Sequence, residues 1–147
     1  MVSGRWRLVT DRLLPLDYGR QAETLGRELT GLQDRLDGRV DLSPLLDRVE
    51  TLRQRTADLK GGDASAANHA LMRVSRALVP LDYTSGDRFD HDPALAESPY
   101  PVLEPIRHLA AAPPGLDESR FAVVAARRAM NCVAHALDEA NAALPAA

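Results

Sequence analysis

The chain contains few cysteine, lysine and aromatic residues, and each shortage limits what the protein can be. Among its 147 residues, Cys132 is the only cysteine, which excludes an internal disulfide and a zinc site built on paired cysteines. Lys60 is the only lysine, so arginine carries nearly all of the positive charge. No apolar run approaches the ~18 residues of a membrane-spanning helix. With aromatic residues at only 4%, the core has to be built from aliphatic side chains.

Charge of one sign is not concentrated anywhere in the chain. Its 18 basic and 21 acidic residues are interspersed and give a net charge of -3. A nucleic-acid-binding surface needs clustered positive charge, so we expect no nucleic-acid partner. The opening residues, MVSGRWRLVTDRLL, are interrupted by arginine and aspartate and do not form the apolar segment of a signal peptide. We expect a cytoplasmic protein with no membrane partner.

Apolar residues at helical spacing are abundant. Alternating spacings of four and three predict a long helix with one buried face, formed by Tyr18, Ala22, Leu25, Leu29, Leu32 and Leu36. A cap oxygen and a proline at 41–44 predict a second helix that ends at Gly61. A third helix is expected from Asp63 to Val79, where Pro80 should end it.

The remainder of the chain divides into a loop and two helices. Residues 81–99 show no sustained period and contain Gly86, Pro93 and Pro99, which predicts an ordered irregular loop. A short helix is expected near 101–112, and a long final helix follows, with Asp117 as its cap. We therefore predict an all-α fold, a four-helix bundle with an ordered irregular loop between the third and last long helices.

The final helix has a wide apolar surface. A line of small residues, Ala122, Ala125, Ala129, Cys132 and Ala136, runs beside a line of bulky ones. Burying each bulky side chain stabilises by roughly 1.5 to 3 kcal/mol, so this line should face the bundle core or a partner. The sequence does not show which of the candidate residues belong to the core and which to a dimer interface. These candidates are Val123, Met130, Val133 and Leu137.

The tetrapeptide Pro-Leu-Asp-Tyr occurs twice, at 15–18 and 80–83. In both copies we expect a helix to stop at the proline, a leucine to cover its end and an aspartate to accept turn or cap hydrogen bonds. The flanking residues differ, so the two copies do not indicate an internal repeat.

Polar residues are dense between 82 and 92. We interpret Asp82, Asp87, Arg88, Phe89 and His91 as parts of a structural loop in which carboxylates pair with the arginine and with backbone N–H groups. The spacing lacks the pattern of a calcium-binding EF-hand and of a zinc-binding His-Glu-x-x-His motif. A metal-dependent hydrolase that uses Asp87, Asp90 and His91 remains a less favoured alternative.

Other reactive pairs have weaker support. Cys132 and His135 lie three residues apart, a spacing that would bring a nucleophile and its base together on one face of a helix, but the sequence supplies no orienting group. His69 shares a polar helix face with Arg73 and Arg76, an arrangement more typical of a solvated surface than of an anion site. We therefore expect no catalytic residue, metal ligand or cofactor in this chain.

The stretch NHALMRVSRALVPLDYTSGDRFDHDPA, with Tyr100-Pro101 beyond it, resembles the transferrin-receptor-like dimerisation domain. This helical domain follows the catalytic domain in glutamate carboxypeptidases and related zinc aminopeptidases. The segment LVTDRLLPLDYGRQAETL resembles the exit from that catalytic domain, so residues 1–16 would be a lead-in. Loosely, the resemblance spans nearly the whole chain, and Asn68 to Pro93 is its most specific part.

The resemblance implies a single domain over 1–147 that forms a homodimer and adjoins a peptidase domain. The family's zinc ligands belong to that catalytic domain, and none maps onto this sequence. The Lys-Tyr pair that lines the carboxypeptidase pocket has no counterpart between His91 and Ser98. The first hypothesis is thus a non-catalytic homodimerisation domain, and the second is a free-standing adaptor that binds a peptide or partner helix in an apolar groove.

Overall fold

A computed structural model describes residues 12–59, 63–84, 98–113 and 117–145, and this part of the chain is helical and contains no strand. Its α-helices are α2 (Tyr18–Leu36), α3 (Ser43–Asp58), α4 (Ala64–Tyr83), α5 (Glu104–Ala111) and α6 (Asp117–Ala143). A 3-10 helix, η2 (Pro101–Leu103), precedes α5. The all-α prediction is confirmed. No helix of the described ranges is long and apolar enough to cross a membrane.

Helix α2 forms where its periodicity predicted it. All six residues of the predicted stripe are buried. The carboxylate of Asp17 caps the helix by accepting a hydrogen bond from the Arg20 backbone N–H at 3.0 Å. Two left-handed residues, Asp37 (φ 48°) and Gly38 (φ 76°), then end the helix and start the turn to α3.

Helix α3 starts at Ser43, with Pro44 in its first turn as predicted. Its N-cap residue, Leu42, makes no side-chain cap hydrogen bond. The carboxylate of Asp41 accepts a hydrogen bond from Ser43 N–H at 2.9 Å instead. Gln33 of α2 accepts one from Leu42 N–H at 2.6 Å. The start of α3 is therefore fixed partly from the neighbouring helix.

The prediction that Pro80 ends the third helix was wrong. Helix α4 continues through Pro80 to Tyr83. Proline removes one backbone bond, but this loss falls in the last turn, where the extra residues bury Leu81. Thr84 closes the helix, because its N–H and its hydroxyl both donate to Pro80 O, at 2.9 and 2.8 Å.

The two Pro-Leu-Asp-Tyr copies therefore have different structures. In the first, Asp17 caps the start of α2, whereas the second forms the last turn of α4. The expectation that a helix stops at the proline was wrong for the second copy, where α4 continues through Pro80. In the first copy the described residues before Pro15 are not helical, and the tetrapeptide precedes a helix instead. Position relative to the flanking apolar stripes decides which structure the tetrapeptide adopts.

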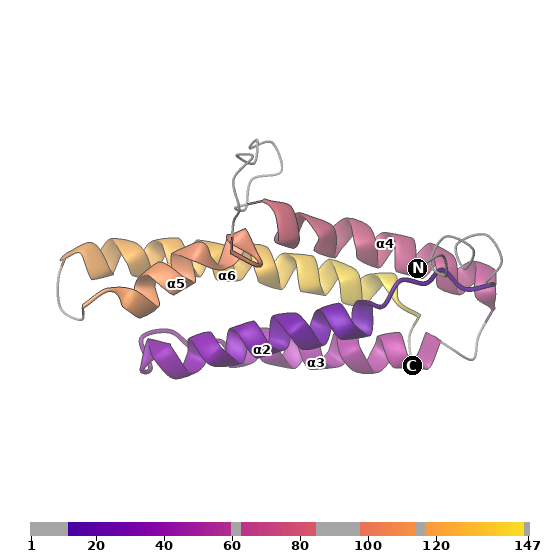
Figure 1. Cartoon of the computed structure of the whole chain (residues 1–147), viewed down its shortest axis with the longest axis horizontal. Coiled ribbons are helices and arrows are strands. Elements are labelled where there is room, and N and C mark those ends of the chain that lie inside the picture. The colour runs from indigo at the N-terminus through magenta and orange to yellow at the C-terminus, as the bar shows by residue number, and fades with distance from the viewer. Residues whose placement is uncertain (1–11, 60–62, 85–97, 114–116, 146–147) are drawn as a thin grey trace, which may run out of the picture.

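The helices form an elongated molecule (Figure 1). Helices α2 and α3 make an antiparallel pair, and at Gly26 an added Cβ would lie 3.3 Å from a Val49 methyl, so the two helices are closely packed. Helix α4, η2 and α5 follow one another along α6, with α4 on its C-terminal half and α5 on its N-terminal half. Helix α6 contacts α3, α4, α5 and η2, which accounts for its wide apolar surface.

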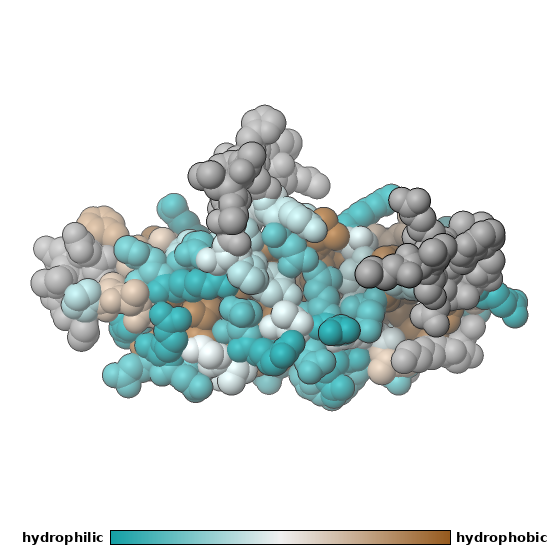
Figure 2. Space-filling model, in the orientation of Figure 1, coloured by the Kyte–Doolittle hydropathy of each residue, from teal (hydrophilic) through white to brown (hydrophobic). Residues whose placement is uncertain are grey.

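The core is aliphatic, as the shortage of aromatic residues required. Its largest fully buried side chains are Leu29, Leu36, Leu42, Leu52, Leu103, Ile106, Leu109 and Leu137, and no charged residue of the described ranges is buried. The surface visible in Figure 2 is mostly hydrophilic, with small apolar patches. Burial of aliphatic surface supplies most of the favourable free energy of such a fold.

Two arginines join helix ends that are far apart in the sequence. Arg39 donates to Leu36 O at 3.0 Å, to Ala112 O at 2.8 Å and to Ala110 O at 3.1 Å, and so links the C-terminal ends of α2 and α5. Arg55 of α3 donates to three carbonyls at the end of α6, those of Asn141, Leu144 and Pro145. A planar guanidinium can satisfy several acceptors at once, which an ammonium group does less well.

The segment before α2 is held along α4 by one side chain. Asn68 accepts a hydrogen bond from Leu14 N–H at 2.8 Å and donates one to Arg12 O at 2.9 Å. Leu13 and Leu14 pack against the core. The end of the expected lead-in is therefore attached to α4 as well as covalently joined to α2.

Candidate functional site

A polar junction lies where the last turn of α4 meets α2 and η2. Asp82 was predicted to belong to a loop, but it lies inside α4, because the helix continues past Pro80. Its carboxylate accepts a hydrogen bond from the Gln21 side chain of α2 at 2.5 Å. The hydroxyl of Tyr100 donates to the Gln21 carbonyl at 3.3 Å. Gln21 thus links the two other residues of the junction.

Burial shifts the titration of both acidic groups at this junction. It raises the pKa of Asp82, and the hydrogen bond from Gln21 opposes the rise only in part. Burial also raises the pKa of Tyr100 to about 12, with further contributions from the carboxylates of Asp82 and Glu28. Tyr100 therefore stays a hydrogen-bond donor at neutral pH.

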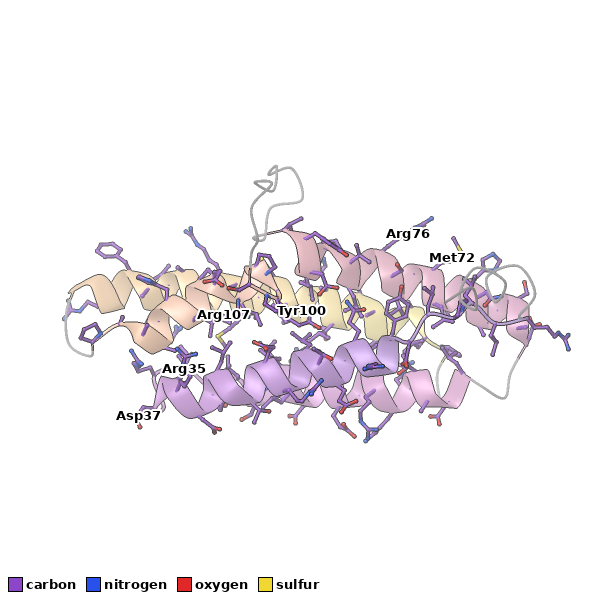
Figure 3. The ribbon with its side chains drawn as sticks, viewed as in Figure 1. Arg35, Asp37, Met72, Arg76, Tyr100 and Arg107 are labelled. Carbon is purple, nitrogen blue, oxygen red and sulfur yellow. The ribbon has the colours of Figure 1, made fainter. Side chains whose placement is uncertain are left out.

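Tyr100 has a left-handed backbone (φ 55°), which is rare for a bulky residue and stores strain. Arg107 stabilises this turn by donating to the carbonyls of Tyr100 and Pro99, at 3.3 and 2.6 Å. The same guanidinium pairs with Glu104 at 2.8 Å and with Glu28 of α2 at 3.2 Å. In Figure 3, Tyr100 and Arg107 both lie on the side of η2 and α5 that faces α2.

We expect Asp82→Asn to stabilise the protein at neutral pH by up to about 1 kcal/mol, because asparagine carries no charge to desolvate. Since the folded-state pKa of Asp82 is raised, its proton stabilises the fold at low pH, and this contribution is lost as the pH rises through the folded-state pKa. The difference between variant and parent in urea unfolding should therefore vanish below about pH 3. An equal difference at pH 3 and pH 7 would contradict a titrating origin.

The other residues predicted for this loop, Asp87, Arg88, Phe89 and His91, lie outside the described residues, as does Asp90 of the alternative metal site. Within the described ranges, no group of three or more histidine, cysteine or acidic side chains is placed to hold a metal ion. The junction of Gln21, Asp82 and Tyr100 offers a hydrogen-bond network rather than a reactive pair.

The other reactive candidates lie on the surface. Cys132 is exposed on α6. The imidazole of His135 faces the carboxylate of Glu139 at 3.9 Å, and both side chains are largely in solvent. His69, Arg73 and Arg76 are exposed on α4. These positions supply accessible groups without the enclosure that a catalytic site uses.

The structure separates the four interface candidates. Val133 and Leu137 are fully buried within the monomer, where α6 packs on its neighbours. Val123 and Met130 are partly buried against the core. The expected line of small residues also divides, because Ala122 and Ala129 are buried whereas Ala125 and Cys132 are exposed. A single chain therefore covers most of the apolar surface of α6.

Sequence reasoning missed the apolar residues that stay in water. On the outer side of α6, Phe121 is 78% exposed and Val124 is 53% exposed. On the outer side of α4, Met72, Val79 and Tyr83 are 46, 40 and 64% exposed. Their helical positions, opposite the buried stripe of each helix, were a signal that could have identified them. Figure 3 shows Met72 and Arg76 projecting from α4 away from the other helices.

The described surface also has two open hollows. One, of about 730 Å³, lies between the segment before α2, the start of α2, the C-terminal part of α3 and one residue of α4, and is lined mainly by apolar residues that include Leu13, Leu59 and Leu71. A shallower groove of about 420 Å³ runs between α2 and α3 over Leu46 and Val49, flanked by charged side chains. Neither of these hollows is lined by Asp82 or Tyr100, and the hollow that Gln21 and Tyr100 do line has a volume of only about 10 Å³.

No protein-family model, curated protein or solved structure matches this chain.

Proposed function

We propose that this chain is a non-catalytic domain that joins two copies of its polypeptide, similar to the C-terminal dimerisation domain of zinc aminopeptidases and carboxypeptidases. The observation that carries the proposal is the exposure of Phe121 (78%) and Val124 (53%) on a helix whose opposite side is already packed. Large apolar side chains left in water on consecutive turns of a helix are typical of an association surface.

The proposed architecture is a four-helix bundle with one interrupted member. Helices α2, α3 and α6 are continuous, and α4, η2 and α5 in series would form the remaining member, because α4 and α5 contact opposite halves of α6. In this proposal any zinc chemistry belongs to a preceding peptidase domain. The attachment of Arg12 and Leu14 to Asn68 would hold the connection to such a domain along α4.

We expect a homodimer at concentrations of roughly 10 to 100 µM, and we expect Phe121→Asp to dissociate it, since a charge would replace the most exposed large apolar group. Light scattering coupled to size exclusion measures the mass. Circular dichroism should show an unchanged fold, because Phe121 is outside the core. Thr51→Asp, on the exposed side of α3, is the matched control and should leave the dimer intact.

A parent chain that stays monomeric at 100 µM would contradict the proposal. If Phe121→Asp still dimerised, the interface would have to lie on another part of the surface.

The adaptor hypothesis has a separate observation in its favour. The outer side of α4 combines the exposed apolar residues Met72, Val79 and Tyr83 with Arg73 and Arg76. A partner helix with an apolar stripe and acidic flanks would be complementary to this surface. Fluorescence anisotropy with a synthetic glutamate-flanked amphipathic helix tests it, and equal binding of a lysine-flanked version would contradict it.

A further inference from the structure

The outer side of α6 carries separated charge. Arg127 and Arg128 are exposed in the first half of the helix, whereas Asp138 and Glu139 are exposed in the second half. Cys132 lies between the two groups on the same exposed side. Asp138 already pairs with Arg48 of α3 at 2.8 Å. Among the described residues, the charged neighbour of Glu139 is the imidazole of His135, at 3.9 Å, which leaves the carboxylate accessible to another cation.

Arg128 and Glu139 share this side of the helix but do not meet within one chain. Eleven residues separate them, which is about 16 Å along a helix axis. The charges of the outer side are therefore not neutralised against each other inside the monomer. Phe121 and Val124 extend the same side toward the start of the helix.

Two-fold pairing of this surface is sensitive to direction. If two copies of α6 lay parallel, Arg128 would face Arg128 and Glu139 would face Glu139, which is repulsive. If they lay antiparallel with the axis near Cys132, Arg127 and Arg128 of each helix would lie along Asp138 and Glu139 of the other. Phe121 and Val124 would then cover the small residues near Ala142 of the partner subunit.

We propose that the partner of the outer α6 surface is a second copy of this chain, paired antiparallel through α6 with its two-fold axis close to Cys132. This inference rests on the proposed homodimerisation and specifies its surface and direction. A two-fold interface uses the same patch on both subunits, so each Arg128–Glu139 contact would occur twice. Charge complementarity selects the direction, and the exposed apolar residues supply buried surface.

A charge exchange tests the pairing. Arg128→Glu and Glu139→Arg should each raise the dimer dissociation constant about tenfold, since each replaces two attractions by two repulsions. The double variant should return the constant to within about twofold of the parent value, because the charge pairs are restored across the interface. Since the two residues are too far apart to interact in the monomer, this restoration reports on the dimer. Analytical ultracentrifugation measures all four constants.

Cross-linking through the single cysteine locates the axis. A short bismaleimide should join two subunits through Cys132 at a concentration where the dimer is populated. The matched control is Thr51→Cys in a Cys132→Ala background, which places the thiol on the exposed side of α3 and should give little cross-linked product.

The outcomes separate this inference from the proposed function. A dimer whose dissociation constant is unchanged in both charge variants, or which forms no cross-link at Cys132, would contradict the α6 pairing but not the proposed homodimerisation. A chain that is monomeric throughout would overturn both.

Discussion

Replacing Leu137 by alanine is expected to lower the free energy of unfolding by about 3 to 4 kcal/mol. Leu137 is fully buried where α6 packs against the other helices, so the truncation removes apolar contacts and leaves a cavity. For a chain of this length the melting temperature should fall by about 10 °C. Urea unfolding followed by circular dichroism measures the change.

The same experiment distinguishes a core residue from an interface residue. Phe121→Ala removes a larger side chain that is 78% exposed, so in the monomer it should change the free energy of unfolding by less than about 0.5 kcal/mol. At a protein concentration below the dimer dissociation constant, the free energies of unfolding of the two variants should therefore differ by about 3 kcal/mol. If both were equally mild, the assignment of Leu137 to the monomer core would be incorrect.

Arg39→Met is expected to cost about 3 kcal/mol, the second large effect. Its guanidinium donates to carbonyls at the ends of both α2 and α5, and methionine keeps the aliphatic stem but none of the donors. Each lost hydrogen bond contributes about 1 kcal/mol, and a carbonyl left unsatisfied in a partly buried position adds to the loss. Thermal unfolding should show a decrease of roughly 10 °C.

Two further variants make this prediction specific. Arg39→Lys should lose about half as much, because an ammonium group keeps the charge near the helix ends but does not reach three carbonyls at once. Arg35→Met, an exposed position in the last turn of α2, is the matched control and should cost less than about 1 kcal/mol. In Figure 3, Arg35 and Asp37 lie at this end of α2. Equal losses of stability for Arg35→Met and Arg39→Met would show that positive charge near the helix end, and not the hydrogen bonds from Arg39 to the two helix ends, is responsible for the loss.

The sequence predicted helices best where one periodic stripe faces one main neighbour. The six buried positions of α2 follow its spacing without exception, since α3 is its main neighbour and the smaller contacts with α4 and α5 fall on the same apolar face. The surface of α6 was harder to predict, because four elements pack around it and the buried stripe takes members from both the bulky and the small line. Composition alone does not show which alanines meet a neighbour.

The candidate site shows a different reason for failure. Asp82 was assigned to a loop because proline normally ends a helix, yet burial of Leu81 outweighs one missing hydrogen bond in a last turn. Its hydrogen-bond partner, Gln21, lies 61 residues away in the chain, and Tyr100, which donates to the carbonyl of Gln21, lies 18 residues away, so only folding brings the three together. No local pattern around residue 82 predicts such a contact.

The arginines illustrate the same limit. The sequence shows a chain that uses arginine in place of lysine, and by itself this bias predicts no structure. The folded chain shows Arg39 and Arg55 each donating to backbone carbonyls of segments far apart in the sequence. Arg107 donates to the nearby carbonyl of Pro99 and also pairs with the distant side chain of Glu28. Multiple donors in one plane make these links possible.

The order of apolar and polar residues by itself determined that this chain is helical, where most helices begin, and that its core is aliphatic, because these properties depend on spacing within one turn or a few turns. Only the tertiary structure decided that α4 continues through Pro80, that Val133 and Leu137 are core residues, and that Phe121 and Val124 are left in water. These outcomes depend on which helices meet, and burial in a packed molecule is a property of neighbours that the local sequence does not contain.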